Sequence, residues 1–262
     1  MCWRKRPTPL WVKRRKIRKN TNERTAVGLS EFDSPPLKPM TKRFWELDAL
    51  RGICLLGMVF IHFLYDLNVS LPVPLRLLQD WGGCAFLLLS GICVTLGHHP
   101  IRRGLIVFGC GILCTLVTWE IHALEFASRQ TVIWFGVLHC LGTCMLLWPL
   151  FGKLSSQILL FFAILLVLSG FYLETLLLPL PWLVPLGIRY PGFASADYFP
   201  LLPNLGFFLL GAAAGRRLYA KKQSLLPNMR PRRFLCFCGR HSLAIYLLHQ
   251  PILFGILFTL NC

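Results

Sequence analysis

The stretch LDALRGICLLGMVFIHFLYDL, residues 47–67, is apolar along most of its length. It is long enough to cross a lipid bilayer as a helix, which takes about 20 residues. It nevertheless carries four ionisable side chains, those of Asp48, Arg51, His62 and Asp66. Such groups are costly in hydrocarbon, and those found there usually face a cavity or a partner. The stretch therefore predicts a membrane fold and indicates where a functional site should be sought.

Further apolar runs follow, separated by short connections. The protein is 55% hydrophobic and only 15% charged, whereas soluble domains are about one quarter charged. We therefore expect an all-α fold, a polytopic membrane helix bundle of about seven transmembrane helices, forming one domain over residues 44–262. The expected spans are 49–67, 81–97, 104–119, 131–151, 157–178, 201–218 and 236–259.

The net charge of +17 is distributed unevenly. Of the 28 Lys and Arg residues, thirteen lie in residues 1–43 and seven in residues 216–233. Three more, Arg102, Arg103 and Lys153, lie in two other connections that are expected on the same side of the membrane. Cytoplasmic segments of membrane proteins carry such an excess. The pattern predicts a cytoplasmic N-terminus and, after seven spans, an external C-terminus. Topology and lipid headgroups account for the charge, so we expect no nucleic-acid partner.

Residues 1–43 are basic, polar and proline-containing, without an amphipathic period, which predicts a disordered cytoplasmic tail. No apolar segment follows the charges before residue 49, so a signal peptide is not expected. Met40 opens the stretch MTKRFWELDALRG, and either Met1 or Met40 is the start of the native protein.

Most of the eleven cysteines fall inside the expected spans, where a thiol behaves as a small apolar packing group. The spacings of cysteine and histidine match no zinc pattern. We expect neither a disulfide nor a bound metal.

Two of the ionisable groups in the opening stretch share one helix face. Arg51 and His62 are eleven residues apart, which at 100° per residue leaves them about 20° out of line and about three turns apart. Asp66 follows His62 by one helical turn and can orient the imidazole or stabilise its positive charge. Asp48 can pair with Arg51 near the cytoplasmic edge. The first span thus predicts a cationic group near the cytoplasm and a histidine deeper in the membrane.

Polar residues of the other spans extend both groups. The expected donor-binding residues near the cytoplasm are Asp48, Arg51, Arg240 and His241; the expected catalytic residues are His62, Asp66, His139 and His249; and the expected acceptor-side residues are Asp80, Asp197, Asn204 and Gln250. For His139 an interhelical hydrogen bond is an open alternative to catalysis. Asp66 and Asp197 fit interfacial caps equally well.

A cationic cytoplasmic mouth with a deeper histidine suits the transfer of a group from an anionic cytosolic donor to an external acceptor. Acyl-coenzyme A is such a donor, because its phosphates bind arginine and lysine. The acceptor's amine or hydroxyl needs a general base beside the thioester. His62 can serve as this base, with Asp66 stabilising the imidazolium.

Five motifs in order carry a family resemblance. They are ELDALRGICLLGMVFIHFLYDL, DWGGCAFLLLSGICVTLG, FGVLHCLG, DYFPLLPNLGFFLLG and GRHSLAIYLLHQPIL. Over residues 42–260 the chain resembles bacterial membrane proteins related to the catalytic region of heparan-alpha-glucosaminide N-acetyltransferase. The interval between Arg51 and His62 is also similar to the signature of the wider family of membrane acyltransferases that modify cell-surface glycans.

The resemblance implies transfer of an acyl group, with acetyl as the expected one, from cytosolic acetyl-CoA to an amine or hydroxyl of an extracytoplasmic sugar or glycan. It also implies a bacterial inner (plasma) membrane protein. The animal enzyme carries a histidine held to be catalytic in its first external loop, whereas NVSLPVPLRLLQD, residues 68–80, contains none. The chemistry here would fall on His62, supported by His139 or His249.

Two other functions fit the same residues. A transporter or flippase would use them to line a polar cavity, although the chain shows no inverted repeat of the kind common in transporters. A non-catalytic membrane interaction protein would use them as packing pairs. The sequence does not indicate an oligomeric state.

Overall fold

The structure is a computed structural model, which describes residues 44–67, 69–125 and 128–260. The expected tail of residues 1–43, and with it the choice between Met1 and Met40, lies outside the described residues. The described residues belong to one compact unit, which begins at Phe44.

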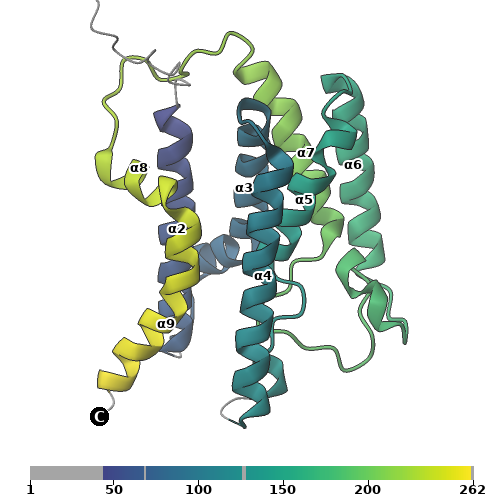
Figure 1. Ribbon diagram of the computed structural model, residues 1–262, viewed down its shortest axis with the longest axis vertical. Helices are drawn as coiled ribbons and strands as arrows, with labels where there is room; N and C mark the ends of the chain where they lie inside the picture. Colours follow the sequence, from purple (N-terminus) through teal and green to yellow (C-terminus); the bar gives the residue numbers. More distant parts are fainter. Residues whose placement is uncertain (1–43, 68, 126–127, 261–262) are drawn as a thin grey trace, which may run out of the picture. The chain divides into compact units, whose positions relative to one another are not determined.

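The described chain is helical, and the expected all-α membrane helix bundle is confirmed (Figure 1). Two short 3-10 helices lie in connections, at Arg129–Thr131 and Pro181–Leu186, and the only β pairing among the described residues is two isolated bridges. The α-helices are α2 (Trp45–Asp66), α3 (Val73–Leu96), α4 (Pro100–Ala123), α5 (Val137–Phe151), α6 (Ser156–Leu173), α7 (Leu201–Leu218), α8 (Arg233–Arg240) and α9 (Ser242–Leu260).

Four of these helices, α2, α3, α4 and α6, are long and apolar enough to cross a membrane. Helix α5 and the first part of α9 are shorter apolar segments. Helix α7 contains Pro203 near its start, and the preceding residue, Leu202, has non-helical backbone angles. The expected spans at 157–178 and 201–218 thus correspond to α6 and α7.

The largest differences from the expected spans occur at α3, at α5 and in the last span. Helix α3 begins eight residues early, at Val73, because prolines at its N-cap and first turn favour a helix start there. Helix α5 begins only at Val137, since the preceding residues bond to another connection, where the Phe199 N–H donates to the Phe135 carbonyl at 2.9 Å. The last expected span divides at His241 into α8 and α9.

Glycines bring the helix backbones close together. A methyl group on Gly91 of α3 would collide with the Phe208 carbonyl of α7, and one on Gly211 of α7 would collide with the Leu88 carbonyl of α3. A methyl group on Gly142 of α5 would likewise collide with Phe108 of α4. Lipid supplies no hydrophobic drive for helix association, so such close backbone contact is a main source of packing energy in membranes.

The interior of the described unit is apolar and so is much of its outer surface. Leu87, Leu159 and Phe208 are fully buried in the main core. On α4, by contrast, Leu105, Leu113 and Leu116 are each more than half exposed. A soluble protein rarely exposes such a continuous apolar face, whereas lipid chains solvate it.

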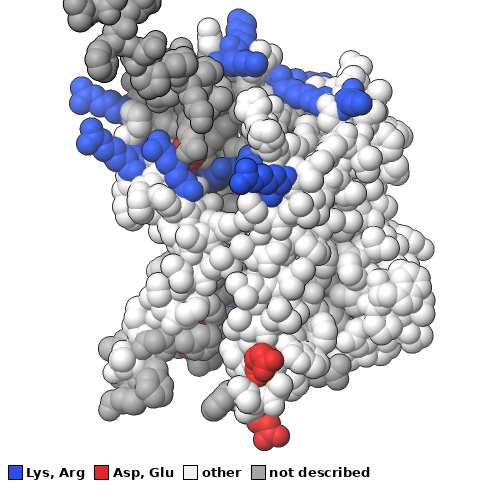
Figure 2. All heavy atoms as spheres, in the orientation of Figure 1, with Lys and Arg blue, Asp and Glu red and all other residues white. Residues whose placement is uncertain are grey.

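Lysine and arginine gather at one end of the described unit, where α2 and α4 begin and α3 and α7 end (Figure 2). We call this the basic end. Its cations lie in three connections, between α3 and α4, α5 and α6, and α7 and α8, or in the helix turns beside them, and include Arg102, Arg103, Lys153, Arg216, Arg217, Lys221, Lys222, Arg230, Arg232 and Arg233. Acidic side chains are visible at the opposite end (Figure 2).

Candidate functional site

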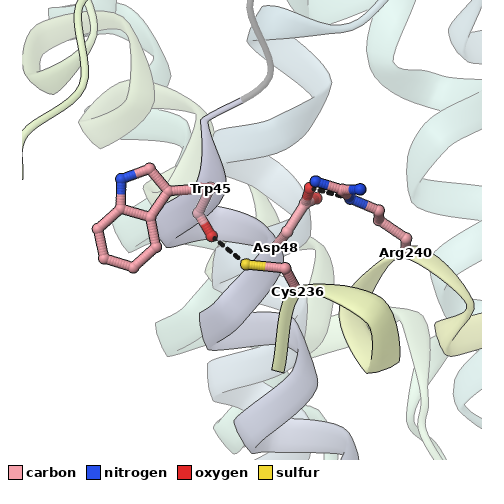
Figure 3. A network of polar contacts seen from close by, with 4 residues as sticks. All are labelled: Trp45, Asp48, Cys236 and Arg240. Atoms are coloured by element: carbon pink, nitrogen blue, oxygen red, sulfur yellow. Dashed lines mark hydrogen bonds and ion pairs between the residues drawn. The ribbon is translucent and has the colours of Figure 1, made fainter. Parts of the chain in front are cut away.

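At the basic end, Asp48 of α2 pairs with Arg240 of α8. The Arg240 Nε lies 3.1 Å from the Asp48 Oδ2, and the side chain of Arg240 is 49% exposed (Figure 3). The neighbouring Cys236 thiol donates to the Trp45 carbonyl at 3.5 Å. The partner of Asp48 is therefore a residue of α8, where the sequence had suggested Arg51 one turn along α2.

Arg51 lies in a second cationic region of the basic end, between α2, α3 and α4. Arg51 and Arg103 are both close enough to the buried Cys93 thiol to interact with it electrostatically. The guanidinium of Arg103 also lies against Gly97, at the C-terminal end of α3. Arg51 was a predicted site residue, whereas Arg103 was predicted only as one of the cations of a charged connection.

A buried carboxylate that the sequence did not single out also lies at this end. Glu46, only 5% exposed, accepts hydrogen bonds from the Ser224 hydroxyl and the Leu225 N–H, each at 3.0 Å, and from the Tyr219 hydroxyl at 3.3 Å. Burial and the neighbouring Glu46 raise the pKa of Tyr219. These bonds fix the start of the α7–α8 connection to the first turn of α2.

Arg216, for which the sequence predicted no structural role, contacts the α5–α6 connection. Its guanidinium donates to the carbonyls of Leu154 and Gly152, just beyond the end of α5, and lies 5.3 Å from the centre of the Trp148 ring. A cation is favourable at a helix C-terminus, where the carbonyls lack partners. Arg216 thereby holds the α5–α6 connection against the end of α7.

Deeper in the bundle, the structure brings two of the predicted catalytic residues together. The rings of His62 on α2 and His249 on α9 lie 5.2 Å apart between centroids and are tilted by 55°. Asp66, one turn beyond His62, interacts electrostatically with His249. His62, Asp66 and His249 therefore form one group, which we call the histidine cluster.

The hydrogen bonding of His249 determines which of its nitrogens is available. Nδ1 lies 2.5 Å from the Tyr246 carbonyl oxygen, which can only accept, so Nδ1 carries the proton. In the neutral ring Nε2 then holds the lone pair. Nε2 is buried and has no hydrogen-bond partner in the described chain; the same holds for the Asp66 Oδ2 and the Gln250 Oε1. Buried polar atoms normally have partners, so these positions suit a ligand or water.

Asp197 connects the histidine-bearing helix to α5. Its Oδ2 accepts from the Tyr246 hydroxyl of α9 at 3.2 Å and from the Val137 N–H at the start of α5 at 3.0 Å. Burial raises the pKa of the Asp197 carboxyl, and these two donors offset part of the rise. Asp197 thus acts as a cap of α5, one of the two roles that the sequence left open. Tyr246, which the sequence did not indicate, links this cap to the helix of His249.

His139 and Asn204 are buried and have local partners. The His139 Nδ1 accepts from the Gly136 N–H at 3.3 Å, and its Nε2 lies 3.4 Å from the Thr115 hydroxyl. The Asn204 amide donates to the Pro200 carbonyl at 2.8 Å. His139 also lies in the first turn of α5, because this helix begins at Val137 and not at residue 131. Both residues thus have hydrogen-bond partners within the packed bundle.

Two further predicted residues lie apart from the histidine cluster. Asp80 is exposed on α3, inside the helix instead of at its start, because α3 begins at Val73. His241 is exposed between α8 and α9, with its ring 4.6 Å from that of Phe237. The described residues contain no group of three or more His, Cys, Asp or Glu placed to hold a metal ion.

Comparison with protein families gives one match. A family model described as heparan-alpha-glucosaminide N-acetyltransferase, catalytic, matches residues 43–251, which include α2 to α8 and the histidine cluster. Neither the search of curated proteins nor the search of solved structures gave a match.

Proposed function

The chain belongs to the family of the heparan-alpha-glucosaminide N-acetyltransferase catalytic domain, and on that premise we propose that it transfers an acetyl group from acetyl-CoA to a sugar across the membrane. The observation that carries the proposal is the contact between His62 and His249. It joins the first and the last helix of the described chain, and the buried Nε2 of His249 has no hydrogen-bond partner among the described residues. General bases of this kind are most often histidines.

In the proposed reaction, His249 is the general base. Its Nε2 takes a proton from the acceptor nitrogen or oxygen, which attacks the thioester carbonyl carbon. The carbon–sulfur bond then breaks, and the coenzyme A thiolate leaves and takes up the proton from the imidazolium. Asp66 stabilises that imidazolium by its charge, and His62 lies against its ring.

The acetyl-CoA donor enters at the basic end, in this proposal the cytoplasmic side of a bacterial plasma membrane. Arg51 is a candidate for its phosphates, whereas the guanidinium of Arg240 already pairs with Asp48. Arg51 and His62 lie on the same helix, about 16 Å apart along its axis. The phosphates of coenzyme A are likewise separated from the thioester by the long pantetheine arm, so one donor molecule can address both positions.

The unpartnered atoms of the histidine cluster and of the neighbouring Gln250 favour an acceptor rich in hydrogen-bond donors. The Asp66 Oδ2, the His249 Nε2 and the Gln250 Oε1 are all acceptors without partners among the described residues. An amine brings two or three N–H donors, and a hydroxyl brings one. We therefore favour the amine of an amino sugar over a hydroxyl as the group that is acetylated.

The test is an assay of the purified full-length protein with radiolabelled acetyl-CoA, with glucosamine as the amine acceptor and glucose as its hydroxyl-only counterpart. With the wild type we expect release of the coenzyme A thiol and transfer of the label to glucosamine. Both should be lost in His249→Ala and in His62→Ala. In Arg51→Ala the reaction should need a higher concentration of acetyl-CoA. Sugar flux into vesicles without thioester consumption would identify a transporter or flippase. Mass spectrometry of cell-envelope glycans with and without the protein would then identify the natural acceptor.

A further inference from the structure

Helix α8 is attached to α2 by one face only. A methyl group on Gly239 of α8 would collide with the Asp48 carbonyl of α2, and one on Gly52 of α2 would collide with the Leu235 carbonyl of α8. No described residue covers the opposite face of α8, where Phe234 is 67% exposed and Phe237 is 57% exposed. Two large aromatic side chains one turn apart are thus left on the outside of a helix that is otherwise firmly packed.

The segment that leads into α8 combines further apolar side chains with cations. Leu225, Leu226 and Met229 are 47%, 41% and 56% exposed. Arg230, Arg232 and Arg233 follow directly and are all exposed. This segment belongs to the basic end of the described unit, where Figure 2 shows lysine and arginine side chains at the surface. Exposed apolar side chains and exposed cations therefore lie within nine consecutive residues, 225–233.

The position of α8 restricts what can cover this surface. Figure 1 shows α8 crossing α2 instead of running along it, and the apolar helix α9 begins at Ser242, directly after α8. A helix that leads into a membrane segment within two residues lies at the membrane surface. Helices with aromatic side chains on one face and cations beside them lie in the plane of the lipid headgroups. Anionic lipids attract such cations.

We propose that α8 is an interfacial helix that binds anionic phospholipid of the leaflet at the basic end, with Phe234 and Phe237 among the upper acyl chains and Arg230, Arg232 and Arg233 on the phosphates. The proposal is independent of the acetyl-transfer proposal. Charge complementarity and the direct continuation into α9 favour lipid over a soluble protein partner as the occupant of this face.

The first test is native mass spectrometry of the full-length protein in detergent, titrated with phosphatidylglycerol and with phosphatidylcholine. A triple variant replaces Arg230, Arg232 and Arg233 by Gln. Its matched control replaces three exposed cations of the same end that lie outside the α7–α8 connection and α8, namely Arg102, Lys153 and Arg217, by Gln. We expect the wild type to prefer phosphatidylglycerol, the first variant to lose at least about fivefold of that preference, the effect of one such cation, and the control to retain it.

Equal losses in the two triple variants would show that the whole basic end attracts anionic lipid without a site at α8. A wild type with no preference for phosphatidylglycerol would overturn the proposal outright. Elution of each variant as a folded species in size-exclusion chromatography makes the comparison valid.

The second test locates the aromatic face. The variant Phe237→Trp is reconstituted in vesicles of phosphatidylglycerol, and the tryptophan fluorescence of the wild type is subtracted from its own. Brominated lipid should quench the remaining fluorescence strongly, and aqueous acrylamide should quench it little. Strong quenching by acrylamide without quenching by brominated lipid would place this face in water, open to a soluble protein, and would refute the proposal.

Discussion

The rings of His62 and His249 lie 5.2 Å apart although they come from helices at opposite ends of the described chain. Each histidine would be an ordinary polar residue of a membrane helix by itself. Their contact, with Asp66 near by and the Nε2 of His249 without a partner among the described residues, is the arrangement on which the proposed chemistry depends. If that proposal is correct, substitutions in the histidine cluster should change the reaction rate, whereas substitutions of the other polar residues should change stability.

We expect His249→Ala to lower the rate of acetyl transfer by about 10² to 10⁴, the usual contribution of a general base, with little change in thermal stability. Thiol release from acetyl-CoA measures the rate. His98→Ala removes an exposed histidine at the basic end and should leave the rate unchanged. A rate for His249→Ala within twofold of the wild type would exclude His249 as the base.

His139→Ala should instead act on stability. The substitution leaves the buried Gly136 N–H without its acceptor and opens a space beside Phe108 and Phe135, whose rings pack on His139. Losing a buried hydrogen-bond partner costs about 1–3 kcal/mol. Thermal unfolding in detergent is the measurement. If His139→Ala is as stable as the wild type but inactive, His139 belongs to the catalytic group after all.

The ion pair between Asp48 and Arg240 should contribute little free energy, because the Arg240 side chain is 49% exposed. Exposed pairs are worth about 0.2–1 kcal/mol. A double-mutant cycle with Asp48→Ala and Arg240→Ala measures this coupling through the free energy of unfolding. An acetyl-CoA dependence that changes in Arg240→Ala but not in Asp48→Ala would point to donor binding by Arg240 instead.

Close packing of α2 and α8 should depend on their glycines. Gly239→Ala brings a methyl group into the Asp48 carbonyl, and overpacking of this kind costs about 1–3 kcal/mol. Gly109→Ala is the matched control, since a methyl group there meets nothing within 4 Å and Ala favours a helix by about 1 kcal/mol. The temperature of thermal unfolding should therefore fall in Gly239→Ala and should not fall in Gly109→Ala. A stable Gly239→Ala protein would mean that α8 can shift away from α2.

Glu46 should be essential for the α7–α8 connection. Glu46→Ala leaves the Ser224 hydroxyl and the Leu225 N–H without their acceptor, and hydrogen bonds to a charged group are worth about 1.5–3 kcal/mol each. We expect faster proteolysis of the connection in limited trypsin digestion, which its lysines and arginines make sensitive. Glu120→Ala, an exposed residue on α4, is the control. Equal digestion of the two variants would contradict this role for Glu46.

Much of the fold and part of the site could be predicted without coordinates. The apolar runs gave the helices α2 to α7 and the alternating charge gave the basic end, because hydropathy and charge act through the local sequence and the surrounding lipid. The helical period correctly directed attention to His62 and Asp66, which are neighbours on one helix. The motifs further predicted the family, which the match over residues 43–251 confirms.

Contacts between helices could not be predicted in this way. Asp48 had a plausible partner one turn away in Arg51, yet it pairs with Arg240, because the glycines at 52 and 239 bring α8 against α2. No sequence pattern around Tyr246 or Glu46 indicated a role for either residue. Their roles depend on Asp197 and on the residues from 219 to 225, which only packing places beside them.

The sequence by itself therefore determined a helical membrane protein of an acetyltransferase family, because the length of an apolar run and the spacing of residues on one helix are local properties. Only the tertiary structure decided which side chains of different helices meet. It joined His62 to His249, left the Nε2 of His249 without a partner among the described residues, and gave His139 and Asn204 partners of their own. The physical reason is that each such contact depends on how closely two backbones approach, and this is a property of the packed bundle and not of any one helix.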